Sequence, residues 1–219
     1  MARKLLFRSS VFPYHVTARG NNREDFPVSL QVMWEIFGKY FAEIEKEYHA
    51  KIHAFVLMPN HFHLLISTPK EDLGVVMQKL MREVTKKANA KSGRTGRIFG
   101  ARYHWSVIMN ENYYDCALKY VYRNPVKADL VDRAEEYLYS TLANVLGKSE
   151  LHFTLRPHNG EHEIIPYGQE HEFLSWLNQA FQTEQDHEIK KGLLRTTFEP
   201  PLSGWDRKRS NFNAMVIRK

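Results

Sequence analysis

The chain has few of the features that would crosslink or anchor it. Its single cysteine, Cys116, excludes an internal disulfide and suits a reducing compartment. No apolar run reaches the roughly 18 residues of a membrane span. The apolar run in the N-terminal MARKLLFRSS is too short for a signal peptide. The segment SGRTGR, residues 92–97, lacks the Gly-Lys-Ser/Thr ending of a phosphate-binding loop. These absences predict a cytoplasmic globular protein without a P-loop.

Acidic residues are almost missing from one segment, residues 79–102. It contains eight basic residues and only Glu83 to oppose them, whereas the whole chain of 219 residues has a net charge of +6. The rest of the chain is therefore close to neutral. A basic segment on a neutral body predicts a polyanionic partner, most simply nucleic acid, although a solvated helix face is the alternative. The segment's basic residues are Lys79, Arg82, Lys86, Lys87, Lys91, Arg94, Arg97 and Arg102.

Two short apolar runs, HAFVLM and HFHLLI, meet at Pro59-Asn60 and predict a strand hairpin over residues 51–58 and 61–67. In the second run, His61 and His63 are two residues apart and would share one face of the sheet. Two neutral imidazoles on a rigid strand can hold a divalent metal. An isolated His-x-His pair, however, is more often structural.

The remaining patterns predict strands at 11–19 and 103–109 and helices at 30–48 and 72–90, each helix having an apolar stripe at three- and four-residue steps. Ser29 is the expected N-cap of the first helix. The order strand, helix, strand, strand, helix, strand is that of the α+β, ferredoxin-like split βαβ fold, with two helices on one face of an antiparallel sheet. A further helix is expected to run from Asn110 or Asn112 to about Arg123.

Three strings, in order along residues 11–131, resemble one family. VLMPNHFHLL resembles the VLMPNHxHLL signature of the REP-associated, HUH-type single-tyrosine transposases, which are IS200-like. YHVTARGNNRE resembles that family's first strand, and KYVYRNPVKADLV resembles its YIHxNPVKAGLV block, with Asp129 where the family usually has glycine. We therefore divide the chain into a transposase domain, 1–147, and a C-terminal helical or irregular extension of unknown role, 148–219.

The resemblance implies an activity. A tyrosine hydroxyl attacks single-stranded DNA at hairpin-flanked sites, forms a 5′-phosphotyrosine intermediate and releases a 3′-hydroxyl. His61 and His63 would bind the catalytic metal, Mg²⁺ or Mn²⁺, although imidazoles alone would suit Zn²⁺ equally well. His15 and Thr17 share a face of the first strand but carry only a weak functional signal.

Helical geometry separates the candidate tyrosines of residues 113–124. Tyr113, Tyr120 and Asn124 lie on one stripe, and Tyr122 points about 200° away from Tyr120. Tyr120 also matches the tyrosine of the family block, so we expect it to be the nucleophile, with Tyr113 next in line and core packing as the alternative role. Asn124 could offer its amide oxygen as a third metal ligand, but a residue before proline is biased out of a helix.

The expected DNA-binding residues are two arginines that flank the first turn and most of the basic residues of segment 79–102. A catalytically inactive nucleic-acid-binding protein of the same fold and a nuclease that uses activated water remain alternatives, and a homodimer is left open. The expected DNA contacts are Arg19, Arg23, Lys79, Arg82, Lys86, Lys87, Arg94, Arg97 and Arg102.

Overall fold

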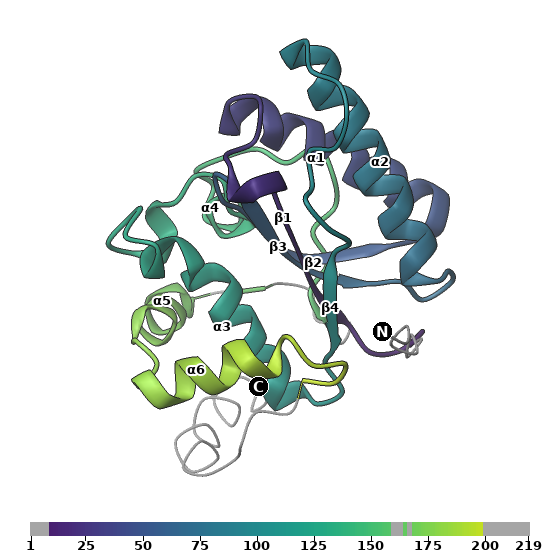
Figure 1. Cartoon of the computed structure of the whole chain (residues 1–219). Coiled ribbons are helices and arrows are strands. Elements are labelled where there is room, and N and C mark those ends of the chain that lie inside the picture. The colour runs from purple at the N-terminus through teal and green to yellow at the C-terminus, as the bar shows by residue number, and fades with distance from the viewer. Residues whose placement is uncertain (1–8, 159–163, 166–167, 199–219) are drawn as a thin grey trace.

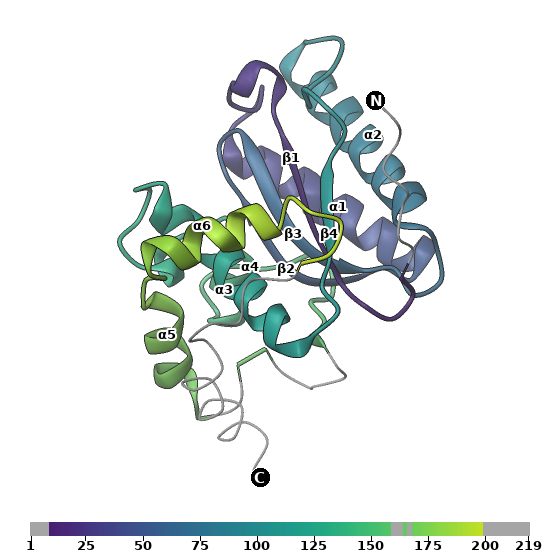
Figure 2. The same cartoon turned by 60° about the horizontal axis from the view of Figure 1, so that its bottom comes forward.

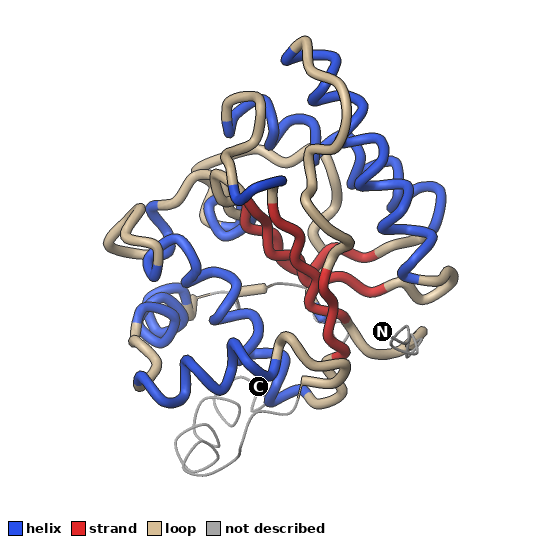
Figure 3. Tube along the Cα trace, in the orientation of Figure 1, coloured by secondary structure: helices blue, strands red, loops and turns tan. Residues whose placement is uncertain are grey.

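The computed structural model describes residues 9–158, 164–165 and 168–198 (Figure 1). They build an antiparallel sheet of four strands in the order β2-β3-β1-β4 (Figure 3). The ferredoxin-like α+β prediction is thus confirmed. No described helix is long and apolar enough to cross a membrane. The elements are β1 (Tyr14–Arg19), a 3₁₀ turn (Asn21–Arg23), α1 (Leu30–Tyr48), β2 (Lys51–Leu57), β3 (His61–Ser67), α2 (Leu73–Ser92), β4 (His104–Val107), α3 (Glu111–Lys127), a 3₁₀ turn (Ala134–Glu136), α4 (Thr141–Val145), α5 (Glu170–Asn178) and α6 (Thr183–Gly192).

The register between the central strands β1 and β3 sorts their side chains onto two faces. Thr17 lies opposite His63, and Arg19 lies opposite His61. Because side chains alternate along a strand, His15 points to the same face as these four residues. The residues between them point to the other face.

Helices α1 and α2 cover that other face. Both helices have a side-chain cap: Ser29, the expected cap of α1, accepts a hydrogen bond from the Val32 amide, and Asp72 caps α2 by accepting one from the Gly74 amide. The core beneath them is apolar and rich in phenylalanine, with Phe41 and Phe55 edge to face at 4.8 Å. The fully buried phenylalanines here are Phe37, Phe41, Phe55 and Phe62.

Helix α3 covers the histidine-bearing face, with α5 and α6 packed against α3 (Figure 2). This face is enclosed rather than open, since His63 is only 6% exposed. The covering helices share one apolar cluster with the sheet, so the described part of the C-terminal extension is packed onto the preceding chain. This cluster includes Val56, Leu65, Val121, Phe173 and Ile189.

Polar contacts fix the two C-terminal helices on α3. Lys119 donates to the Trp176 carbonyl at 2.6 Å, and its ammonium lies 5.0 Å from the Trp176 ring centre. At the C-terminal end of α3, Lys127 forms an ion pair with Asp186 of α6. The charged side of α3 is therefore turned toward α5 and α6.

Helix α3 continues past the predicted end at Arg123, through Pro125 to Lys127. Asn124, the residue before Pro125, is biased away from the helical conformation. Burial of Pro125 and hydrogen bonds to the last carbonyls of the helix outweigh this bias. Leu130 N donates to the Pro125 carbonyl, and Asp129 N donates to the Val126 carbonyl. These two bonds form a Schellman motif with Asp129 in the left-handed conformation, at φ 53°.

Later parts of the chain cover both edges of the sheet. At the β4 edge, Val107 N donates to the Thr196 carbonyl at 2.9 Å, and Phe198 N donates to the Val107 carbonyl at 2.8 Å. At the β2 edge, Leu57 N donates to the Tyr139 carbonyl at 2.9 Å. Neither edge strand is left with its full row of free backbone groups.

Candidate active site

His61 and His63 lie on one face of β3, as their spacing predicts. Their ring centres are 5.1 Å apart and their planes cross at 79°. His61, at the start of the strand, is partly exposed, whereas His63 is buried beneath α3. The pair therefore joins an accessible imidazole to an enclosed one.

Asn60 fixes the orientation of the His61 ring. Its amide nitrogen donates to the Arg23 carbonyl at 2.9 Å, so its amide oxygen faces His61 Nδ1 at 2.7 Å. Because that oxygen can only accept, His61 Nδ1 carries the hydrogen and Nε2 keeps a lone pair. Gly20 is needed beside this turn, since a Cβ there would lie 2.5 Å from the Glu24 carbonyl oxygen.

His15 joins the pair from β1. Its Nε2 lies 3.0 Å from His63 Nδ1, and the two rings stack at 5.2 Å with an angle of 21°. Sequence reasoning gave His15 little weight. Its position two residues before Thr17, on the strand that pairs with β3, was the signal that could have found it.

Burial keeps all three imidazoles neutral. It lowers the pKa of His15 to about 3, and burial together with the charge of Arg19 lowers the pKa of His61 to about 4. The pKa of His63 is also well below its usual value, first because of burial and then because of His15, His61 and Arg19. Neutral imidazole is the form that binds metal ions.

Tyr120 of α3 lies against these histidines. Its ring is edge-on to His63 at 5.6 Å and to His15 at 6.2 Å. Burial, and then the charge of Asp186, raise the pKa of Tyr120 to about 12. Its side chain, only 8% exposed, is therefore a phenol rather than a phenolate at neutral pH.

The other tyrosines of α3 make different contacts. Tyr122 is fully buried, with its hydroxyl 3.2 Å from Thr141 Oγ1. Tyr114 stacks on His158 at 4.4 Å, and Tyr113 lies edge-on to Phe198 at 5.9 Å. The predicted separation of Tyr120 from Tyr122 is confirmed.

Asn124 follows one turn after Tyr120 and is buried. Its amide nitrogen donates to the Tyr120 carbonyl at 2.8 Å, which leaves the amide oxygen for another partner. No group of three His, Cys, Asp or Glu that could hold a metal occurs among the described residues. Two neutral imidazoles are of the donor type that suits a divalent metal, and a further ligand from the described residues would be of another kind, such as an amide oxygen.

A basic groove lies between α2 and the segment before β4. Its volume is about 540 Å³, and its lining contains four cations and no acidic residue. Asn21 N donates to the Ile98 carbonyl, and Gly100 N donates to the Arg19 carbonyl, so one wall is paired with the end of β1. The groove therefore lies at the end of the sheet where His61 stands opposite Arg19. The lining is Met81, Arg82, Thr85, Lys86, Gly96, Arg97, Ile98, Phe99, Ala101 and Arg102.

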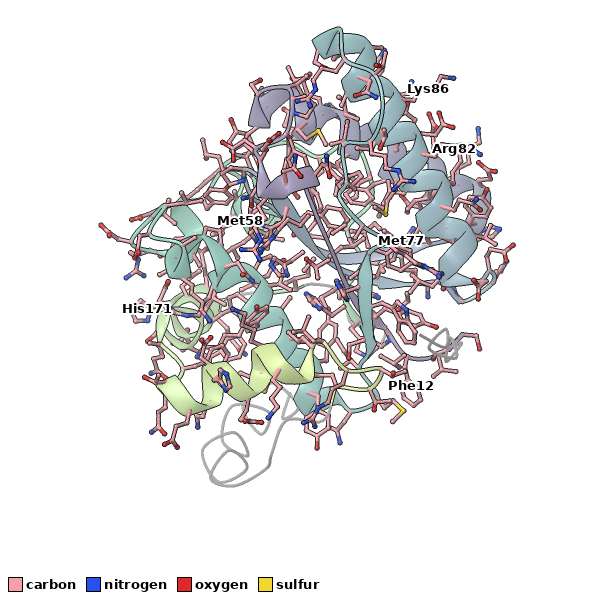
Figure 4. All side chains as sticks on the ribbon, viewed as in Figure 1. Phe12, Met58, Met77, Arg82, Lys86 and His171 are labelled. Carbon is pink, nitrogen blue, oxygen red and sulfur yellow. The ribbon has the colours of Figure 1, made fainter. Side chains whose placement is uncertain are left out.

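The other predicted DNA contacts are more scattered. Lys79 pairs with Glu47 of α1 at 3.1 Å and does not line the groove. Lys87 and Arg94 are exposed but do not line the groove, and Figure 4 shows Arg82 and Lys86 along α2. Arg19 and Arg23 are exposed, at the end of β1 and in the following turn.

A family model described as "Transposase IS200 like" matches residues 9–124, more than half of the chain. The chain belongs to this family. The IS200-like match spans the three histidines, Tyr120, Asn124 and the whole basic groove, and it ends before α4. As an IS200-like protein, the chain is a DNA-processing enzyme of the transposase class, with DNA binding and DNA transposition as the functions of that class.

Two solved structures resemble this IS200-like chain. One is a REP-associated tyrosine transposase bound to a REP hairpin, with 20% identity, a TM-score of 0.57, and coverage of 75% of this chain and 99% of that one. The other is a protein of Deinococcus radiodurans R1 described as a transposase, with 15% identity, a TM-score of 0.38, and coverage of 55% and 95%. The first supports the same fold. No curated protein matches the chain.

Proposed function

We propose that this IS200-like chain nicks and rejoins single-stranded DNA with Tyr120 as the nucleophile. The observation that carries this proposal is the packing of the Tyr120 ring against His63, at 5.6 Å within one chain. A phenol beside two neutral imidazoles brings a nucleophile to a site able to hold a metal ion. The tyrosine and the histidines would then act in cis.

The reaction exchanges one phosphodiester for another. Tyr120 Oη forms a bond to phosphorus, the bond from phosphorus to the 3′ oxygen breaks, and the phenolic proton is balanced by protonation of the leaving 3′ oxygen. The DNA 5′ end remains on Tyr120 as a phosphotyrosine. A 3′-hydroxyl reverses these steps and joins strands without a cofactor that supplies energy.

His61 and His63 would hold a divalent metal, Mg²⁺ or Mn²⁺, through Nε2, with the Asn124 amide oxygen as a further ligand. When bound, such a metal polarises a phosphoryl oxygen and stabilises the developing charge. Arg19, on the same sheet face, would contact the DNA phosphate. The raised pKa of Tyr120 means that its proton must be removed during the attack.

The basic groove would bind the DNA backbone. The similar structure bound to a REP hairpin supports hairpin DNA as the ligand. We expect Arg82→Ala, Lys86→Ala to reduce the slope of log affinity against log salt by about two units, roughly one per phosphate contact. Lys39→Ala, Lys46→Ala on the exposed side of α1 is the matched control. Equal slopes for the two variants would place the DNA elsewhere.

The nucleophile is tested on denaturing gels with labelled hairpin-flanked oligonucleotides and Mn²⁺. Wild-type protein should give a covalent protein–DNA band, and Tyr120→Phe should give none, because it removes the hydroxyl and keeps the ring. Tyr114→Phe, buried on the same helix, should behave as wild type. A covalent band from Tyr120→Phe would reject Tyr120 and make Tyr113 the next candidate.

The enclosure of Tyr120, only 8% exposed, favours a second function: a protein of this fold that binds hairpin DNA without nicking it. The same gels separate the two. Binding without cleavage supports the inactive protein, and cleavage without a covalent band supports a nuclease that uses water.

A further inference from the structure

His15 is a buried polar side chain whose partner is a candidate metal ligand. It is 2% exposed, and its Nε2 meets His63 Nδ1 at 3.0 Å. Its other ring nitrogen, Nδ1, has no hydrogen-bond partner among the described residues. An unpaired buried polar atom costs stability, so a phenylalanine would fill this place at lower cost. An imidazole at this place therefore points to a role beyond packing.

Two proton arrangements satisfy the contact between the rings. In one, His63 Nδ1–H donates to His15 Nε2, and His63 Nε2 keeps a lone pair. In the other, His15 Nε2–H donates, and His63 Nε2 carries a hydrogen that blocks a metal. Both leave His15 Nδ1 unpaired, so neither gains an extra hydrogen bond within the protein. A cation at His63 Nε2 would select the first.

His61 has the same arrangement with a different partner. The Asn60 oxygen accepts from its Nδ1 and leaves Nε2 free. Two separate groups able to accept a hydrogen bond, the Asn60 oxygen from the turn and His15 Nε2 from β1, thus lie at the Nδ1 atoms of the two imidazoles.

We propose that His15 is a positioning residue that accepts a hydrogen bond from His63 Nδ1 and thereby presents His63 Nε2 to the metal. This inference rests on the proposed function, because it presumes that His61 and His63 bind a divalent cation. Partners of this kind fix the tautomer and the ring orientation of a metal-binding histidine, and their loss lowers metal affinity by about 10- to 100-fold.

Mn²⁺ titration calorimetry without DNA tests the proposal. His15→Phe keeps an aromatic ring but lacks the acceptor, so we expect its Mn²⁺ affinity to fall by about 10- to 100-fold. His15→Gln places an amide oxygen near the position of Nε2 and should stay within about threefold of wild type. His53→Gln, which replaces another buried histidine bonded to Ser67 and the Arg156 carbonyl, is the control and should bind as wild type.

Wild-type affinity in His15→Phe, or an equal loss in His15→Gln and His15→Phe, would overturn the positioning role while the metal site stands. If wild-type protein and the His61→Ala, His63→Ala variant bind Mn²⁺ equally poorly, the proposed metal site fails and the inference fails with it. Nitrogen-15 NMR of the wild-type imidazoles with Mg²⁺ gives a reading that needs no variant. His63 should carry its hydrogen on Nδ1, and a hydrogen on Nε2 would overturn the proposal.

Discussion

The two faces of the sheet are built from the same strands but bury different kinds of side chain. On the α1–α2 face, Phe55 and Phe62 pack in an apolar core. One residue further along β3, His63 is also buried but faces His15 and Tyr120. Apolar burial stabilises a fold, whereas burial of polar rings costs stability unless they are paired. The comparison suggests that the first face holds the fold together and that the second is shaped for chemistry.

The largest expected effect comes from the second face. The variant His61→Ala, His63→Ala should lose all detectable DNA cleavage, because both proposed metal ligands are gone. Cleavage of labelled oligonucleotides measures this, and circular dichroism establishes that the variant is folded. Full cleavage by a folded double variant would end the proposal for this face.

Removal of a large side chain from the first face should act on stability instead. Phe62→Ala should lower the free energy of unfolding by about 3–5 kcal/mol, because it leaves a cavity among packed rings. Urea unfolding measures the change. A loss below about 1 kcal/mol would mean that this core is not the main source of stability.

A change of pH should separate the faces further. His15, His61 and His63 have lowered pKa values in the folded protein, so the unfolded chain takes up protons first as the pH falls below about 6.5. Stability should therefore decrease on acidification by about 1.4 kcal/mol per pH unit for each such histidine and level off near pH 3–4 for His15 and His61.

Urea unfolding between pH 7 and pH 4.5 measures this slope. His15→Phe removes one of the titrating groups and should make the slope shallower, whereas Phe62→Ala should lower stability by a similar amount at each pH. An unchanged slope in His15→Phe would show that His15 is not buried in its neutral form.

The smallest effect concerns the end of α3, the helix that covers the histidines. Asp129→Gly should stabilise the protein by about 0.5 kcal/mol. Relief of left-handed strain, about 1 kcal/mol, is partly offset by the greater freedom of glycine in the unfolded chain. Thermal unfolding measures it, with Asp129→Ala as the control, which should destabilise because alanine keeps the Cβ and tolerates positive φ poorly.

Local patterns were sufficient for most of the first face. The caps at Ser29 and Asp72, the helix stripes and the break at Pro59-Asn60 all depend on residues close in sequence. That His61 and His63 share one face follows from the alternation of side chains along a strand, which is also a local property. The departure at Asp129 was also visible, although only the structure shows that it falls on a left-handed residue.

The covered face was harder to predict because its contacts join distant residues. His15 and His63 are 48 positions apart, and their contact depends on the register of β1 against β3. The contact from Lys119 to the Trp176 carbonyl spans 57 positions and has no local pattern. Helix α3 extends beyond its predicted end at Arg123 because tertiary packing outweighs the tendency of the residue before proline to leave the helix.

The covered sheet edges bear on how copies of the chain can meet. An unprotected edge strand is a template on which another chain can add a strand, by β-augmentation or by aggregation. Here the Val107 backbone is already paired with residues 196–198, and the ring of Phe198 lies against Gly192 so closely that a Cβ there would be 3.0 Å from it. A second copy could pair with β4 at Val107 only by displacing this segment, so the segment blocks strand addition at that end of β4.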